Sequence, residues 1–207
     1  MIDGIIFDVD GTVWDSTPVV ERAWNDALAE AGYKERVTAD RLKGLFGLPM
    51  NDIIRDILPW ETEENISAFA PICFKYEHEY LAQEAGIVYE GFEDMLKALH
   101  GKYPLYIVSN CQAGYIELML SKTGFAGYFE DHLCPGDTGE LKAANIRKIC
   151  ERHNLKSPVY VGDTQMDANA CIDAGVPIAF AAYGFGTVEK PDYVINSPME
   201  LVNVICE

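Results

Sequence analysis

Short apolar runs recur along the chain and alternate with longer amphipathic stretches. The runs lie at residues 4–7, 105–108, 159–161 and 178–180, with a weaker one at 132–134. Continuous runs of β-branched and aromatic residues are typical of strands that are buried on both faces, as in a parallel sheet. The pattern therefore predicts a buried parallel sheet.

Helices are predicted between these strands. Apolar residues recur at helical spacing in four segments, 92–99, 114–122, 141–153 and 167–174. Gly124 and Gly175 follow two of them, at the position where a left-handed glycine often ends a helix. Alternation of strands and helices is typical of βαβ units, so we predict an α/β fold with a doubly wound parallel sheet.

Residues 16–84 break this alternation, because their pattern is helical throughout. Pro18 suits the first turn of a helix that ends near Gly32. A later apolar stripe, in steps of three and four residues, contains Ile66, Phe69, Cys73, Tyr76 and Tyr80. We expect Pro71 to kink or restart that later helix, since proline lacks the N–H group that a helix interior requires.

The helical segment predicts a chain of two domains. We expect residues 1–15 and 85–207 to form the sheet-containing core domain. We expect residues 16–84 to form an all-helical cap domain inserted after the first strand, and its roughly 70 residues are enough for a small domain.

Charge and composition limit the partners of the chain. It has 207 residues, with 16 Lys and Arg against 33 Asp and Glu, and a net charge of −17. Such acidity argues against nucleic-acid and anionic-membrane partners. Asp3 and Asp8 stand where a secretory signal would need basic and then apolar residues. Six scattered cysteines without a C-x-x-C pair suit a reducing compartment, so we expect a cytoplasmic protein.

The strongest chemical signal follows the first apolar run. Asp8 and Asp10 are two residues apart on a predicted strand, so their carboxylates point the same way, and Gly11 lets the chain turn after them. Two adjacent carboxylates need a shared cation or a shared proton. The carboxyl ends of strands are also where open α/β sheets bind ligands. A simple Asp-Gly turn is the alternative, but an apolar strand that runs straight into the pair favours a site.

Three further polar groups follow predicted strands or begin predicted helices. Asp163 leaves a strand and Asp167 lies in the first turn of the next helix, where an acidic residue can also serve only the helix start. Ser109 and Asn110 precede a helix whose free N–H groups can face an anion, although an ordinary N-cap has the same pattern. Lys142 begins its helix after a glycine-rich connection.

In this order, D-x-D-G-T, Ser-Asn, Lys and G-D-x-x-x-D resemble the motifs of the haloacid dehalogenase (HAD) superfamily over essentially the whole chain. The long insert resembles the family's helical-cap subclass, and the resemblance implies a Rossmann-like core. The family commonly has Lys-Pro at the third motif, whereas Ala143 follows Lys142 here. Phosphate-transferring members keep the second aspartate that dehalogenating members lack, so Asp10 implies a phosphatase or a phosphomutase.

The resemblance also implies a role for each motif residue. Asp8 would attack phosphorus to form an aspartyl-phosphate, and Asp10 would protonate the leaving oxygen and later activate water. Mg²⁺ would be held by Asp8, the main-chain carbonyl of Asp10 and Asp163, with Asp167 in support, because oxygen ligands beside a phosphoryl group suit this ion. The phosphoryl group would be bound by Gly11, Thr12, Ser109, Asn110 and Lys142.

Substrate choice is expected to lie in the cap. Residues 44–49, Gly-Leu-Phe-Gly-Leu-Pro, form a predicted loop whose place resembles the substrate-facing loop of this cap type. The locally positive stretch 34–43 leads to the hypothesis that Arg41 or Lys43 steers an anionic substrate, with Lys43 and Gly44 as candidate substrate contacts. A solvated helix face is the alternative interpretation.

Three functions compete at this point. Gly162 before Asp163, together with the cap loop, favours a phosphoglycolate-phosphatase-like hydrolase of a small phosphorylated metabolite. A β-phosphoglucomutase-like phosphotransferase would have a basic residue shortly after Gly44 and a glutamate in place of Gly162. A phospho-receiver module is a non-enzymatic alternative, disfavoured because receivers are shorter and lack a helical insert.

Overall fold

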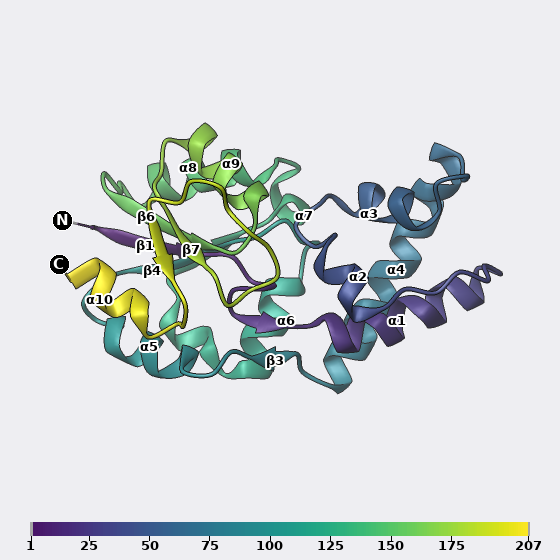
Figure 1. Cartoon of the computed structure of the whole chain (residues 1–207), viewed down its shortest axis with the longest axis horizontal. Coiled ribbons are helices and arrows are strands. Elements are labelled where there is room, and N and C mark those ends of the chain that lie inside the picture. Colours follow the sequence, from purple (N-terminus) through teal and green to yellow (C-terminus); the bar gives the residue numbers. More distant parts are fainter. Residues whose placement is uncertain (1, 207) are drawn as a thin grey trace.

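Six parallel strands form the central sheet of the computed structural model, which describes residues 2–206 (Figure 1). Their order is β5-β4-β1-β6-β7-β8, so β1 lies inside the sheet between β4 and β6. The strands are β1 (Gly4–Phe7), β4 (Leu105–Val108), β5 (Asp131–Leu133), β6 (Pro158–Gly162), β7 (Ile178–Ala181) and β8 (Tyr193–Ile195). The predicted doubly wound α/β fold is confirmed, and β8 is a strand that the sequence pattern did not predict.

Helices cover both faces of this sheet (Figure 1). The helices outside residues 16–84 are α5 (Phe92–Leu99), α6 (Tyr115–Thr123), α7 (Pro135–Thr138), α8 (Lys142–Arg152), α9 (Gln165–Ala174) and α10 (Glu200–Cys206), with a 3₁₀ turn at Phe125–Tyr128. Alternate side chains of β1 enter two apolar clusters: Ile5 and Phe7 pack with α5 and α6, and Ile6 packs with α8 and α9. This burial on both faces explains the continuous apolar runs in the sequence.

Four helices lie between the short strands β2 (Trp14–Asp15) and β3 (Ile87–Val88). They are α1 (Thr17–Glu30), α2 (Ala39–Lys43), α3 (Met50–Ile57) and α4 (Glu63–Gln83), and we call them the helical unit. β2 and β3 pair antiparallel, so the chain leaves and re-enters the sheet region at one place. The helical pattern predicted for residues 16–84 is therefore confirmed, whereas β2 and β3 were not predicted.

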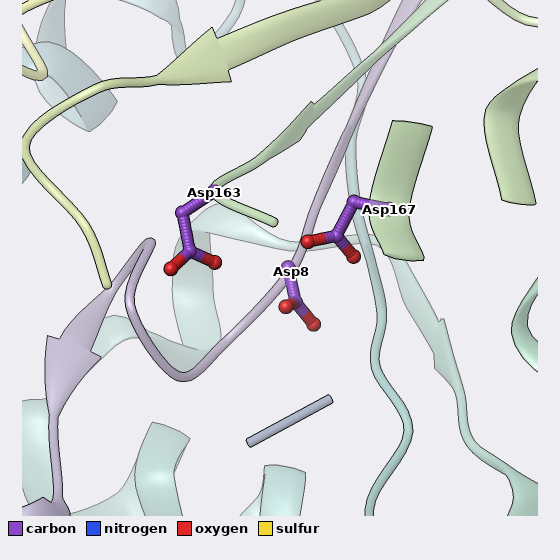
Figure 2. A group of neighbouring side chains, drawn as sticks. All are labelled: Asp8, Asp163 and Asp167. Atoms are coloured by element: carbon purple, nitrogen blue, oxygen red, sulfur yellow. The ribbon is translucent and has the colours of Figure 1, made fainter. Parts of the chain in front are cut away.

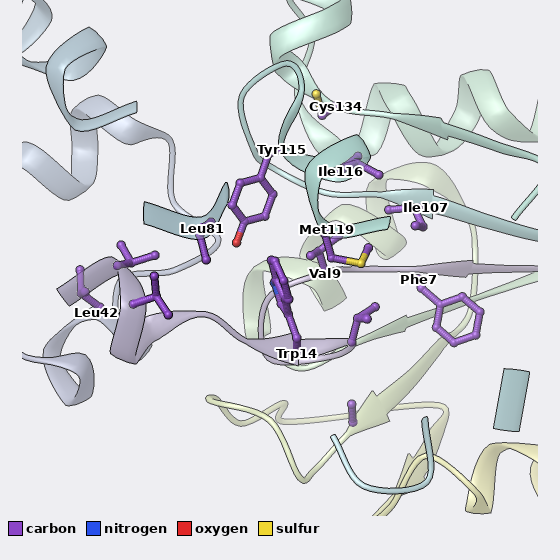
Figure 3. Packing of buried hydrophobic residues seen from close by; sticks show 14 of the residues in the cluster. Phe7, Val9, Trp14, Leu42, Leu81, Ile107, Tyr115, Ile116, Met119 and Cys134 are labelled. Atoms are coloured by element: carbon purple, nitrogen blue, oxygen red, sulfur yellow. The ribbon is translucent and has the colours of Figure 1, made fainter. Parts of the chain in front are cut away.

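One apolar cluster joins the helical unit to the sheet. Figure 3 shows Trp14 and Tyr115 between Leu42 and Leu81 of the helical unit and the sheet residues around Phe7. The rings of Trp14 and Tyr115 meet edge to face, with centroids 6.1 Å apart. Because this packing is continuous, the helical unit has a defined position over the carboxyl end of β1.

Helix α4 runs unbroken through Pro71, so the predicted restart at this residue is wrong. Pro71 is exposed, as is Ser67 one turn earlier, and water can therefore bond the carbonyl that proline leaves without a donor. The buried stripe that includes Ile66, Phe69 and Cys73 packs α4 along α1 and outweighs this local cost. Although α4 has 21 residues, no described helix combines the length and the apolar character needed to cross a membrane.

Candidate active site

The carboxyl ends of two neighbouring strands place Asp8 and Asp163 side by side. Asp8 follows β1 and donates its backbone N–H to the Val161 carbonyl of β6, at 2.9 Å, and Asp163 follows β6. Asp167 reaches the same point from α9. One oxygen of each of these three buried carboxylates lies within 4.8 Å of the others (Figure 2). Three of the four predicted metal ligands thus meet, and the Asp10 side chain is not in this cluster.

Asp167 uses its two carboxylate oxygens for different purposes. Oδ2 accepts hydrogen bonds from the Thr164 backbone N–H at 2.9 Å and hydroxyl at 2.6 Å, while the Thr164 hydroxyl accepts from the Asp167 N–H. This capping box begins α9. Oδ1 instead accepts a hydrogen bond from Lys142. The helix-start and active-site interpretations of Asp167 are therefore compatible.

Lys142 is the buried cation of this site. Its ammonium lies 3.0 Å from Asp8 Oδ1 and also pairs with Asp167. Burial alone would lower the pKa of Lys142, but the Asp167 and Asp8 carboxylates outweigh it and raise that pKa, so the side chain keeps its charge. The position of Lys142 at the start of α8 brings it to the site although Ala143, rather than proline, follows it.

The three carboxylates fit a divalent cation. They carry up to three negative charges against the single charge of Lys142, and Asp163 Oδ1 is buried with no hydrogen-bond partner among the described residues. Burial, followed by repulsion from Asp167 and Asp8, raises the pKa of Asp163 well above its usual value. A hard cation with oxygen ligands would satisfy the unpartnered atom and favour the ionised form of all three groups.

Two glycines allow the chain to pass close to Asp163. Gly11 has φ +79°, and a Cβ there would lie 2.0 Å from Asp163 Oδ2. A Cβ on Gly184 would lie 2.3 Å from the Gly11 carbonyl oxygen. The neighbouring Phe185 donates its N–H to Asp163 Oδ2 at 2.7 Å. The sequence analysis does not predict this loop after β7; glycines three and five residues beyond the strand end are the signal that could have found it.

Asp10 is held apart from the three carboxylates by a cluster of donors. Its Oδ1 accepts hydrogen bonds from Ser16 Oγ at 2.5 Å, Tyr115 OH at 2.7 Å and Trp14 Nε1 at 3.1 Å. Burial raises the pKa of Asp10 to about 7, against the lowering effect of the Ser16 and Tyr115 hydrogen bonds. Oδ2 has no protein hydrogen bond among the described residues. A carboxyl with one fixed oxygen and a pKa near neutrality can both give and take a proton.

The other predicted phosphoryl-binding residues lie around Asp8 and the helical unit. Ser109 is buried directly after β4; the charge of Lys142 and hydrogen bonding from the Ser109 side chain both oppose the rise in the pKa of Asp8 that burial causes. Thr12 has a buried hydroxyl without a partner among the described residues. Asn110 donates its Nδ2–H to the Gly47 carbonyl at 3.0 Å, which ties the core to the predicted substrate-facing loop.

The two basic residues predicted to steer the substrate, Arg41 and Lys43, each pair with a carboxylate. Lys43 lies 3.1 Å from Asp15 Oδ2 and 5.8 Å from the centre of the Phe185 ring. Arg41 forms an exposed ion pair with Asp56 at 2.8 Å. Gly44 is the C-cap of α2. The structure thus places neither predicted cap contact, Lys43 or Gly44, among the carboxylates around Asp8.

A cavity of about 290 Å³ separates the helical unit from the strand ends. Asp10 and Asn110 line it from the core, and the loop of residues 46–49 lines it from the helical unit. Lys43 and Gly44 are not among its lining residues. Because Asp10 faces both this cavity and its own donor cluster, a molecule bound here is within reach of its carboxyl group.

Family comparison agrees with this geometry. The family model for haloacid dehalogenase-like hydrolases matches residues 5–181, which include β1, the helical unit and the strands up to β7. The chain belongs to the haloacid dehalogenase-like hydrolase family, as its motifs predicted.

Particular relatives match over nearly their full length. A phosphoglycolate phosphatase of Photobacterium profundum is 26% identical over 97% of this chain and 94% of its own length. A phosphoglycolate phosphatase of Aquifex aeolicus is 28% identical over 97% and 95%. A solved structure of a haloacid dehalogenase-like hydrolase from Streptococcus pneumoniae has a TM-score of 0.86 at 23% identity, covering 99% of this chain and 98% of the other. The fold is thus shared with this solved structure across both the sheet and the helical unit.

Proposed function

We propose that the protein is a Mg²⁺-dependent phosphatase that hydrolyses a small phosphate monoester through an aspartyl-phosphate on Asp8. The observation that carries this proposal is the pairing of two unlike carboxyl groups at one strand end. Asp8 lies against Lys142, and Asp10 has a pKa of about 7 and lines the cavity. One group suits nucleophilic attack and the other suits proton transfer. The phosphatases named among its relatives support the same reaction class.

In the first step, an oxygen of Asp8 bonds to phosphorus and the bond between phosphorus and the alcohol oxygen breaks. Asp10 gives its proton to that leaving oxygen, so the alcohol departs uncharged. In the second step, water attacks the phosphorus of the aspartyl-phosphate while ionised Asp10 takes its proton. Inorganic phosphate leaves and the Asp8 carboxylate is restored.

The rest of the site would bind the phosphoryl group and a metal ion. Asp8, Asp163 and the main-chain carbonyl of Asp10 would hold Mg²⁺, with Asp167 in support. This ion would supply positive charge that lets a phosphate dianion approach three carboxylates. Phosphoryl oxygens would be met by the donors Lys142, Ser109 and Asn110 and by the Gly11 to Thr12 turn.

The helical unit would act as a cap domain, residues 16–84, over a core domain of residues 1–15 and 85–207. The β2–β3 ribbon is the only described strand pairing outside the main sheet, and it joins the two parts of the chain that connect cap and core. Closing the cap over the cavity would exclude bulk water until the alcohol has left. Free, scattered cysteines support a cytoplasmic location.

The test is p-nitrophenyl phosphate hydrolysis by the wild type and by Asp8→Asn, each with Mg²⁺ and with EDTA. Loss of the nucleophile should lower kcat by at least ~1,000-fold, since the remaining groups cannot form the covalent intermediate. EDTA should abolish turnover by the wild type, and added Mg²⁺ should restore it. Turnover that survives Asp8→Asn, or that continues in EDTA, would contradict the proposal.

A further inference from the structure

The cavity beneath the helical unit is where the alcohol part of a substrate would lie, because Asp10 lines it. Its walls are largely apolar and include Trp24, Phe46, Ile53 and Phe74. Among the described residues that line it, none is Lys, Arg or His. The cavity therefore suits an apolar group. An anionic group would find no cation among the lining side chains.

Glu77, from the middle of α4, adds a carboxyl group to this cavity; burial raises its pKa, and the hydrogen bonds from Trp24 and Gln112 oppose that rise and favour the ionised form. Its side chain is buried, with the residue only 6% exposed. Oε2 accepts a hydrogen bond from Trp24 Nε1 at 3.0 Å, and Oε1 accepts one from Gln112 Nε2 at 3.2 Å. Each carboxylate oxygen can accept a further hydrogen bond. Glu77 is thus fixed by a partner in the helical unit and a partner in the core, and it can still receive a donor from a ligand.

The two basic side chains described near the strand ends, Lys142 and Lys43, are engaged elsewhere. Lys142 is buried between Asp8 and Asp167, and Lys43 is paired with Asp15. A ligand carboxylate in this cavity would lose its hydration without gaining a cation, and it would also meet Glu77. Burying an unpaired charge beside a like charge costs several kcal/mol.

We propose that the preferred substrate is a phosphate monoester whose alcohol carries no negative charge, with an apolar carbon body and a hydroxyl or ammonium donor that reaches Glu77. This inference rests on the proposed phosphatase function and specifies the substrate class of the same site. Phosphoglycolate, the substrate in the names of the relatives, should therefore not be the preferred substrate of this chain. Its carboxylate would face the Glu77 side of the cavity.

Three esters of similar size, each with a two-carbon alcohol, test the inference: phosphoglycolate, 2-hydroxyethyl phosphate and O-phosphoethanolamine, which end in a carboxylate, a hydroxyl and an ammonium group. With Mg²⁺ present, kcat/KM for the hydroxyl and ammonium esters should exceed that for phosphoglycolate by at least ~10-fold. Glu77→Gln keeps the size of the side chain and removes its charge, so it should reduce the preference for ammonium over carboxylate by ~10-fold. Glu79→Gln, an exposed position on the same helix, is the matched control and should leave that preference unchanged.

A second variant guards against misfolding of Glu77→Gln. Gln112→Lys places a cation beside Glu77 from the opposite wall, and it should raise kcat/KM for phosphoglycolate relative to the ammonium ester. A wild type that prefers phosphoglycolate, or a preference that neither variant changes, overturns the inference.

Binding separates the failure of this inference from the failure of the proposed function. Calorimetric titration of Mg²⁺-loaded Asp10→Asn, which keeps the three carboxylates of the proposed metal site and lacks the proton donor, measures binding without rapid turnover, and its dissociation constants should follow the same order. Absence of Asp8-dependent hydrolysis of p-nitrophenyl phosphate would refute the phosphatase mechanism alone. Equal binding of the three esters would refute the charge preference alone.

Discussion

The strand-end site consists mainly of charged side chains, whereas the cavity beneath the helical unit has mainly apolar walls. At the strand ends, Asp8, Asp163 and Asp167 lie together, Lys142 pairs with Asp8 and Asp167, and glycines that tolerate no Cβ pass close to Asp163. The cavity has apolar walls in which Glu77 is fixed by two hydrogen bonds. Charges and backbone contacts suit a reaction that requires fixed geometry. The side chains that line the cavity can change without altering that geometry. If the proposed function is correct, substitutions in the cavity walls should change substrate choice without abolishing the chemistry at the strand ends.

The largest effect on kcat/KM among the strand-end and cavity variants below is expected at Asp163. Asp163→Asn keeps an acceptor for the Phe185 N–H but removes a charge from the proposed metal site, so kcat/KM should fall by at least ~100-fold. Burial raises the pKa of Asp163, so its ionisation costs stability, and this cost grows as pH rises toward the raised pKa. In EDTA, Asp163→Asn should therefore melt above the wild type, increasingly so at higher pH.

Thermal denaturation with and without Mg²⁺ checks both statements. The wild type should gain stability from Mg²⁺ and the variant should not. An equal gain in both proteins would mean that Asp163 does not hold the ion.

A second prediction concerns the close contact at Gly11. Gly11→Ala combines an unfavourable φ with a Cβ that meets Asp163, and it should destabilise the protein by more than the ~1–2 kcal/mol of the φ effect alone. Gly139→Ala is the matched control, because Gly139 has φ +71° and no atom near its missing Cβ. Urea unfolding of the two variants measures the difference. Equal losses would show that contact with Asp163 costs nothing.

A third prediction uses the pKa of Asp10. If Asp10 must carry a proton in the first step, kcat/KM should fall as pH rises through about 7. Tyr115→Phe removes a hydrogen bond that lowers this pKa, so the midpoint of the fall should move to higher pH. Tyr183→Phe is the control, because its hydroxyl bonds the Thr12 carbonyl instead. If the midpoint does not move in Tyr115→Phe, Asp10 is not the group whose titration controls kcat/KM.

The smallest effect is expected at the paired basic residues of the helical unit. Arg41 and Lys43 face Asp56 and Asp15 and do not line the cavity. Replacing both with glutamine should change KM for a good substrate by less than ~3-fold, as for other exposed ion pairs. A large rise in KM would instead support the hypothesis, drawn from the sequence alone, that one of them steers the substrate.

Periodicity and strand-end motifs were enough to predict much of this molecule. The buried runs predicted β1, β4, β6 and β7, because strands covered on both faces have few polar positions. The motif residues Asp8, Asp163 and Asp167 could be anticipated together, since parallel strands end at one edge of the sheet.

The parts that escaped prediction depend on contacts between distant segments. Tyr115 bonds Asp10 from 105 residues away, and no local pattern distinguishes it from an ordinary apolar helix position. Glu77 interrupts a buried stripe and has meaning only once Trp24 and Gln112 surround it. The continuity of α4 through Pro71 depends on the packing of α4 on α1, which cannot be read from the residues beside the proline.

Chemical trapping of the covalent intermediate on Asp8 would identify the nucleophile. The Mg²⁺-loaded protein would be mixed with excess p-nitrophenyl phosphate, quenched within the first turnover, and treated with borohydride, which reduces an aspartyl-phosphate to homoserine. Peptide mass spectrometry should then find homoserine at position 8 and an unmodified Asp10. Homoserine at position 10, or an unmodified Asp8 in a sample that has released p-nitrophenol, would contradict the account.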